Sequence, residues 1–203
     1  MESEALRLSE LICARVCHDL SGLAGTLVSA LDLAQEQGNE GGEAVAVARE
    51  AADALAHRLR LLRAALGPVS EPLGASGIAD LAAGLGKRLR VDVSGLGAAA
   101  LAGTRARLAL AMLLLGAEAL PAGGVLRLSA DTAKGALRVA ASGPRAAWPP
   151  GVAQRLASGV PPRGLNDLLA SLCGLLARDA GLGLAAEESP PALHAMPLGR
   201  SRG

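Results

Sequence analysis

His18 is the side chain in this sequence best suited to covalent chemistry. It lies in the run Ile12-Cys13-Ala14-Arg15-Val16-Cys17-His18-Asp19-Leu20, where apolar residues recur every three to four positions and predict a helix. At about 100° per residue, His18 falls about 160° from the centre of the apolar side, so we expect its ring to point away from the core. Free imidazole titrates near pH 6.5, so its neutral, nucleophilic form is plentiful at neutral pH.

The residues expected on the same face as His18 are mostly small. They are Ala14, Arg15, Ser21, Gly22, Gly25 and Ser29. A glycine inside a helix costs roughly 1 kcal/mol relative to alanine, so two glycines on one face need a compensating use. We interpret them as a surface that lets another protein approach the imidazole. The alternative is a solvated histidine in a chain that is rich in glycine throughout.

Two long helices are expected to position His18 in a domain covering residues 1–67. A glycine-rich turn at 37–42 separates them, and Gly67-Pro68 ends the second. The apolar side of the first helix contains Ile12, Cys13, Val16, Leu20, Leu23, Ala24, Leu27 and Leu31, and that of the second contains Ala48, Ala52, Leu55, Leu59, Leu62 and Leu66. Stripes this wide predict a helical hairpin that dimerises into a four-helix bundle.

After a linker at Pro68–Ser76, the pattern predicts a second domain of mixed type over residues 77–197, which makes the fold class α+β. We expect helices on one face of a mostly antiparallel sheet, and a disordered segment at Leu198–Gly203. The expected helices are Ile78–Leu89, Thr104–Leu120 and Leu165–Ala180, the expected strands are Arg90–Val93, Val125–Ala130, Ala136–Ala141, Gly183–Glu188 and Ala192–Met196, and the proline-rich stretch Trp148–Val160 is expected to be irregular.

Composition excludes several classes of function. The 20 basic and 19 acidic side chains nearly cancel, and Phe and Tyr are absent, so neither a phosphate-binding surface nor a base-stacking platform is expected and we exclude nucleic acid as a partner. Uncharged runs reach only about 10 to 12 residues, whereas a membrane span needs about 20. The acidic N-terminus lacks the features of a secretory signal, so we expect a cytoplasmic protein that does not bind a membrane.

The remaining cysteines and histidines point to no second site. Cys13 and Cys17 are expected to be buried in the bundle while His18 faces outward, which argues against a metal or haem motif. His57 is expected at the surface, and no partner is evident for His194.

Three segments resemble the ChpT-type histidine phosphotransferases. The run from Ile12 to Leu20, followed by Gly25, Leu27, Leu31 and Asp32, is similar to the phosphoacceptor helix of that family. Arg58–Gly67 resembles the Arg/Leu-rich end of its second helix, and Glu118–Gly124 resembles a helix-to-strand turn in its second domain. One departure is Leu23, which stands where the family usually has a proline.

The resemblance implies a dimeric helical hairpin followed by a degenerate domain shaped like the ATPase domain of histidine kinases. The helix at 108–118 contains no Asn to hold Mg²⁺, and Val139–Pro144 lacks the adenine-binding carboxylate of a kinase. We therefore expect no bound cofactor and no ATP, with Mg²⁺ supplied by a partner receiver domain.

The implied activity is a phosphorelay step in which His18 takes a phosphoryl group from one receiver domain and gives it to another. Asp19 would orient the ring or accept its proton, or would only be a solvated carboxylate. Arg15 would pair with the phosphoryl group or with receiver carboxylates, or with neither, and Ser21, Gly22 and Gly25 would contact the partner.

The implied partners, in an alphaproteobacterial setting, are a second copy of the chain, the receiver of a hybrid histidine kinase and the receiver of a CtrA-like response regulator. The alternatives are a non-catalytic adaptor that binds a response regulator, and a kinase with a strongly diverged ATP site.

Overall fold

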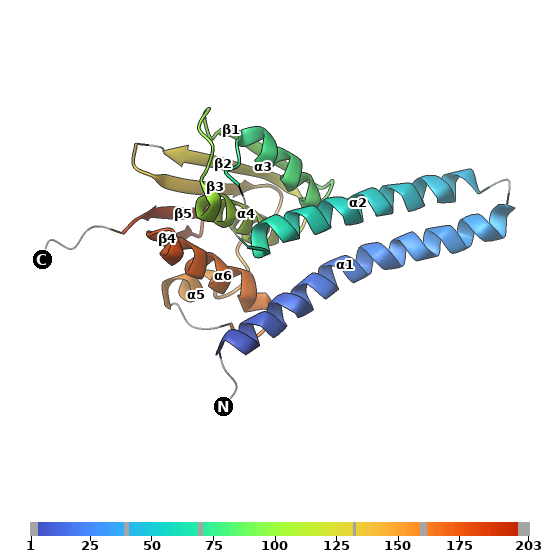
Figure 1. The fold of residues 1–203 in the computed structure, drawn as a ribbon, viewed down its shortest axis with the longest axis horizontal. Coiled ribbons are helices and arrows are strands. Elements are labelled where there is room, and N and C mark those ends of the chain that lie inside the picture. The colour runs from blue at the N-terminus through green and yellow to red at the C-terminus, as the bar shows by residue number, and fades with distance from the viewer. Residues whose placement is uncertain (1–3, 39–40, 69–70, 132, 159–161, 199–203) are drawn as a thin grey trace, which may run out of the picture.

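The computed structural model describes residues 4–38, 41–68, 71–131, 133–158 and 162–198. A long helical hairpin is followed by a five-stranded mixed sheet with helices, as the sequence predicted. Figure 1 shows the hairpin extending away from the sheet, with the N-terminal end of its first helix beside the C-terminal half of the chain. Most of the segment predicted to be disordered, residues 199–203, lies outside the described residues.

The hairpin consists of α1 (Glu4–Gln37) and α2 (Gly42–Leu66). The turn brings Gly41 so close to α1 that a Cβ there would lie 2.7 Å from the main-chain oxygen of Ala34. Glycine at this position therefore allows the two helices to pack from the turn onward. Gly67 caps α2, and its amide donates to the main-chain oxygen of Arg63 at 2.9 Å.

Ten elements follow the hairpin among the described residues, in an α+β arrangement. In chain order they are α3 (Ala75–Ala82), η2 (Ala83–Leu85), β1 (Leu89–Gly95), α4 (Gly103–Glu118), β2 (Gly124–Asp131), β3 (Ala136–Ser142), α5 (Val152–Ser158), α6 (Leu165–Asp179), β4 (Leu182–Glu187) and β5 (Ala192–Pro197). The strand order is β1-β2-β3-β5-β4, with β1 and β2 parallel and the other neighbouring pairs antiparallel.

The core lies between the sheet and α4. Residues Leu108–Leu115 of α4 are all at most 2% exposed, so this helix is apolar on every side and is enclosed. On β2, Leu126 and Leu128 are buried while Arg127 between them is exposed, which is the alternation of a sheet with one covered face.

The core continues into the hairpin through α2. Leu61 and Ala65 are fully buried and belong to the same cluster as α4 and the sheet. The sequence interpretation assigned α2 a single apolar stripe for dimerisation, whereas α2 has a second buried face that packs on the rest of the chain. Leu59 of the predicted stripe is 50% exposed, and Leu31 of the α1 stripe is also 50% exposed.

Two local predictions were wrong. The helix predicted over Ile78–Leu89 ends at Ala82 and continues only as η2, because Gly86 takes φ +98°, a conformation that breaks the helix. The proline-rich stretch predicted to be irregular contains α5. Cys13 and Cys17 are exposed in the single chain, where only Cys173 is buried, so their burial in a dimeric bundle stays a prediction.

Among the described residues, α1 is long and apolar enough to cross a membrane, with a mean hydropathy of 1.3 over 18 residues. The prediction of no membrane span rested on uncharged runs, which Arg15, Asp19 and Asp32 interrupt. In the fold, α1 packs lengthwise on α2, and the side chains of Arg15 and Asp19 are only 17% and 8% exposed because they pair with other elements. Ala30 is the only residue of α1 that is buried in the single chain, so most of the apolar side of this helix is not covered by it.

Candidate functional site

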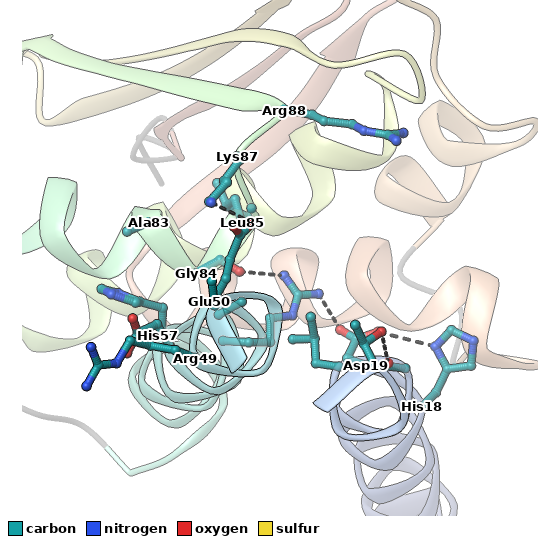
Figure 2. Close-up of a pocket in the computed structure, with 18 residues that line it drawn as sticks. His18, Asp19, Arg49, Glu50, His57, Ala83, Gly84, Leu85, Lys87 and Arg88 are labelled. Atoms are coloured by element: carbon teal, nitrogen blue, oxygen red, sulfur yellow. Dashed lines mark hydrogen bonds and ion pairs between the residues drawn. The ribbon is translucent and has the colours of Figure 1, made fainter. Parts of the chain in front are cut away.

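His18 lies on the outer face of α1, with 77% of its side chain exposed. Nδ1 of the ring is 3.4 Å from Oδ1 of Asp19, the next residue in the chain. Within the described part of the chain, Asp19 is the only hydrogen-bonding partner of the ring. Figure 2 shows the ring at the side of α1, joined to Asp19 by a dashed line.

The surface beside His18 is open where the sequence predicted small residues. Ser21, Gly22 and Gly25 are exposed, and a Cβ added at either glycine would meet no atom within 4 Å. Packing within the chain therefore does not require glycine at these two positions. Their small size leaves the approach to the imidazole free of side chains.

Asp19 is the most enclosed charged group of the site, with 8% of its side chain exposed. Arg15 Nε lies 3.1 Å from one carboxylate oxygen and 3.2 Å from the other, and Arg58 Nη2 donates to Oδ2. Burial raises the pKa of the Asp19 carboxyl, but the two guanidinium groups, Arg58 foremost, outweigh it and hold that pKa below its usual value. Asp19 is therefore ionised at neutral pH and is suited to orient the ring rather than to accept its proton.

Arg15 does not extend into solvent, as a group waiting for a phosphoryl ligand would. It is 17% exposed and bridges Asp19 and Glu118, with Nη1 lying 2.9 Å from Glu118 Oε1. The expected role of Arg15 in binding a partner stays a prediction, but in this chain its guanidinium is paired internally. The physical reason is that Glu118, at the end of α4, comes close enough to α1 to take the guanidinium.

Sequence reasoning assigned no role to Arg58 or to Glu118. Arg58 joins Asp19 to the second half of the chain, because its Nη1 donates to the main-chain oxygen of Gly84 in η2 at 3.3 Å. The sequence did indicate that Arg58 faces inward. Arg58 is spaced three, four and seven residues from Leu61, Leu62 and Ala65, so it lies on the buried face of α2.

An open groove of about 1110 Å³ runs along the hairpin beside His18. Its walls come from α1, from α2 and from the η2–β1 turn, and they include Asp19, Arg49, Glu50, Asp53, His57, Lys87 and Arg88. Figure 2 shows Lys87 reaching from the turn to Glu50 on α2, and their charged atoms are 2.5 Å apart. The groove therefore carries both signs of charge.

A second groove of about 640 Å³ continues towards the tip of the hairpin and shares Thr26 with the first. Leu33 and Val47 line it and are 46% and 45% exposed. Leu33 on α1 and Val47 on α2 thus place apolar side chains on the same side of the hairpin as His18, nearer to its tip.

The other histidines have their own contacts. Arg60 Nη2 lies 3.1 Å from Nδ1 of His57 on α2. His194 Nε2 on β5 is 3.1 Å from Glu187 Oε1 on the neighbouring strand, which supplies the partner that the sequence did not reveal. No group of three His, Cys, Asp or Glu side chains suited to a metal ion occurs among the described residues.

A sequence model of the histidine phosphotransferase C-terminal domain matches residues 75–191, which is more than half of the chain. The chain belongs to the histidine phosphotransferase family. No curated protein matches it in sequence.

The fold is similar to that of a bacterial phosphotransferase solved at 1.7 Å resolution. The TM-score is 0.79 at 23% identity, and the match covers 96% of this chain and 97% of that chain. A blue-light activated histidine kinase from Erythrobacter litoralis matches with a TM-score of 0.45 at 17% identity, over 92% of this chain and 61% of that chain. The order of hairpin and sheet domain in this histidine phosphotransferase is thus also found in the solved phosphotransferase.

Proposed function

We propose that this protein relays a phosphoryl group between receiver domains through a phosphohistidine at His18. The observation that carries the proposal is the placement of His18 in a histidine phosphotransferase: its ring is 77% exposed, and Asp19 holds Nδ1. With Nδ1 carrying the proton and donating to Asp19, the lone pair of Nε2 is available to an incoming phosphorus.

In the forward step, Nε2 of His18 attacks the phosphorus of an aspartyl phosphate on a receiver domain. The N–P bond forms, the P–O bond to the aspartyl carboxyl breaks, and the aspartate leaves as a carboxylate. The Nδ1 proton stays on the ring, so the phosphorylated imidazole is cationic and the ionised Asp19 stabilises it. No general base is needed, and alignment supplies most of the catalysis.

In the return step, a carboxylate of a second receiver attacks the same phosphorus and the neutral imidazole leaves. A ring protonated at Nδ1 is the better leaving group, because the electron pair of the N–P bond returns to a cation. Asp19 therefore assists both directions by keeping the proton on Nδ1.

We propose that the phosphoryl group comes from a protein and not from ATP. α4 contains no Asn that could hold Mg²⁺, and the helix is enclosed on every side. Trp148, Val152 and Leu156, on the segment that follows β3, pack against the core. The Mg²⁺ that phosphoryl transfer requires would be supplied by the acidic pocket of the receiver.

The two connected grooves on the His18 side of the hairpin are the proposed receiver-docking surface. They offer charged groups near His18 and the apolar pair Leu33 and Val47 towards the tip. We propose the receiver of a hybrid histidine kinase as donor and a CtrA-like response regulator as acceptor, in the cytoplasm.

We propose that a second copy of the chain covers the opposite side of the hairpin. Leu6, Val28 and Leu31 of α1 and Val45 and Leu59 of α2 are each at least half exposed. By helical spacing, the α1 residues lie on a different side from His18, together with Cys13 and Cys17. Pairing two such hairpins gives a four-helix bundle and leaves both docking surfaces open.

The test is transfer of labelled phosphate from a pre-phosphorylated receiver domain to the wild-type chain, to His18→Ala and to His194→Ala. Acid-labile, base-stable label is expected on the wild type and on His194→Ala, and none on His18→Ala. Absence of label on the wild type with a broad panel of receivers would reject the relay and favour a non-catalytic adaptor. Label on His18→Ala would reject His18 as the acceptor.

A further inference from the structure

A chain of charged groups ties the site to the second half of the molecule. Asp19 accepts hydrogen bonds from Arg15 and Arg58, Arg15 Nη1 continues to Glu118 at the end of α4, and Arg58 Nη1 continues to the main-chain oxygen of Gly84 in η2. Both arginines that hold Asp19 are therefore themselves fixed by the domain that follows the hairpin.

We propose that Arg58 and Glu118 are positioning residues for phosphotransfer: through Asp19 they fix the orientation and the proton position of the His18 ring. The proposal rests on the function proposed above, because it concerns the same nucleophile. It assigns the second domain the role of holding Asp19 in place.

The first argument is geometric. An imidazole that is 77% exposed has few contacts of its own to hold it, and in the described chain its hydrogen-bonding partner is Asp19 at 3.4 Å. The direction of that carboxylate therefore decides the direction of the ring. Arg15 and Arg58 approach the carboxylate from α1 and from α2, so Asp19 cannot rotate without breaking several charge-assisted hydrogen bonds.

The second argument concerns the close approach that anchors Arg58. A Cβ at Gly84 would lie 2.8 Å from Cβ of Leu61, so glycine is needed for η2 to pack this tightly on α2. That approach brings the Gly84 carbonyl within 3.3 Å of Arg58. The planar guanidinium can then bond the carbonyl with one amino group and Asp19 with the other, which the single ammonium of a lysine cannot reproduce.

The third argument is electrostatic. Two guanidinium groups keep Asp19 ionised, and an ionised carboxylate accepts a hydrogen bond from Nδ1–H. It therefore favours the tautomer that carries the proton on Nδ1 and leaves Nε2 with its lone pair. Glu118 contributes by fixing Arg15, which would otherwise be a flexible side chain between α1 and α4.

The experiment measures the His18 tautomer directly and the transfer kinetics separately. Imidazole ¹⁵N NMR spectra are recorded above the titration range of histidine for the wild type, Arg58→Ala, Arg58→Lys and Glu118→Gln, and His18→Ala assigns the His18 signals. Glu187→Gln is the matched control, because Glu187 contacts His194 at 3.1 Å on the sheet and should change only that ring. Transfer rates are then measured at saturating and at limiting receiver concentrations.

The wild type is expected to hold His18 mainly in the Nδ1–H form. Arg58→Ala should shift His18 towards the Nε2–H form and lower the rate at saturating receiver by about 10-fold, with little change in KM. Glu118→Gln should shift it less, and Arg58→Lys should restore part of the loss. Near-UV spectra of Trp148 check that each variant is folded. Should Arg58→Ala fail to fold, the lysine and glutamine variants carry the test.

His18 signals that are unchanged in every folded variant would overturn the proposal, as would a rate loss expressed only in KM. The function can fail separately. If the wild type accepts no phosphoryl group from any receiver while the tautomer still responds to Arg58 and Glu118, the structural coupling stands and the relay is rejected.

Discussion

Arg15 Nη1 on α1 lies 2.9 Å from Glu118 Oε1 on α4, although the two residues are 103 positions apart in the chain. Glu118 is the last residue of α4, where the partial negative charge of the helix end disfavours a carboxylate. Burial also raises the pKa of the Glu118 carboxyl, and the hydrogen bond from Arg15 opposes this effect. The hairpin thus supplies the positive charge that this buried end of α4 needs.

Arg15→Ala should lower the free energy of unfolding by about 1–3 kcal/mol, because it leaves Glu118 and Asp19 with one partner fewer in a poorly solvated place. The double variant Arg15→Ala/Glu118→Gln should lose less than the sum of the two single variants. Urea denaturation followed by the fluorescence of Trp148, the single tryptophan, measures all three. The exposed pair Arg127 and Asp92 is the control and should show little coupling, because solvent screens both charges. Strict additivity at Arg15 and Glu118 would contradict the interpretation.

Asp19 should make the free energy of unfolding fall as the pH is lowered. The arginines lower its pKa in the folded chain, so the stabilisation is fully present above the unfolded-state pKa near 3.8 and is lost as the pH falls through the lower folded-state pKa. Asp19→Asn should therefore be less stable than the wild type at pH 7, and the difference should shrink below about pH 4. Unfolding in urea at several pH values measures this difference.

The control for Asp19 is Asp32→Asn. Asp32 is exposed on the same helix and forms no ion pair within the described residues. Its variant should stay close to the wild type at every pH. A stability difference for Asp19→Asn that does not change between pH 7 and pH 3 would show that the carboxylate charge is not what stabilises the site.

The sequence predicted most of the helices, the five strands and the outward direction of His18, because local periodicity determines those features. It missed the partners of Asp19, since Arg58 and Glu118 come near it only after η2 and α4 pack on the hairpin. It also assigned Arg15 to solvent, because a helical wheel shows the face of a residue but not what another domain places against that face. α5 was missed because prolines at its start dominate the local pattern, although proline is tolerated before a first helical turn.

Leu31 and Leu33 separate the two proposed surfaces of the hairpin. They are 50% and 46% exposed, two positions apart on α1, and so point to nearly opposite sides of it. Leu31→Glu should convert the proposed dimer to a monomer in sedimentation, because a charge would enter the core of the proposed bundle. Leu33→Glu should leave the dimer intact and raise the KM for a phosphorylated receiver. The reverse assignment, or equal effects of the two, would show that the two surfaces are wrongly placed.

Gly25 should show a conflict between stability and partner binding. A Cβ at this position would meet no atom within 4 Å, and alanine is favoured over glycine inside a helix by about 0.8–1.0 kcal/mol. Gly25→Ala should therefore raise the free energy of unfolding by about 1 kcal/mol. It should also place a methyl group where a receiver approaches His18, and raise the KM of transfer by about 10-fold.

The control is Gly174→Ala in α6, where a Cβ would lie 3.9 Å from the Arg178 side chain and transfer should be unaffected. If Gly25→Ala were more stable with unchanged transfer, the small residues beside His18 would not be part of the docking surface.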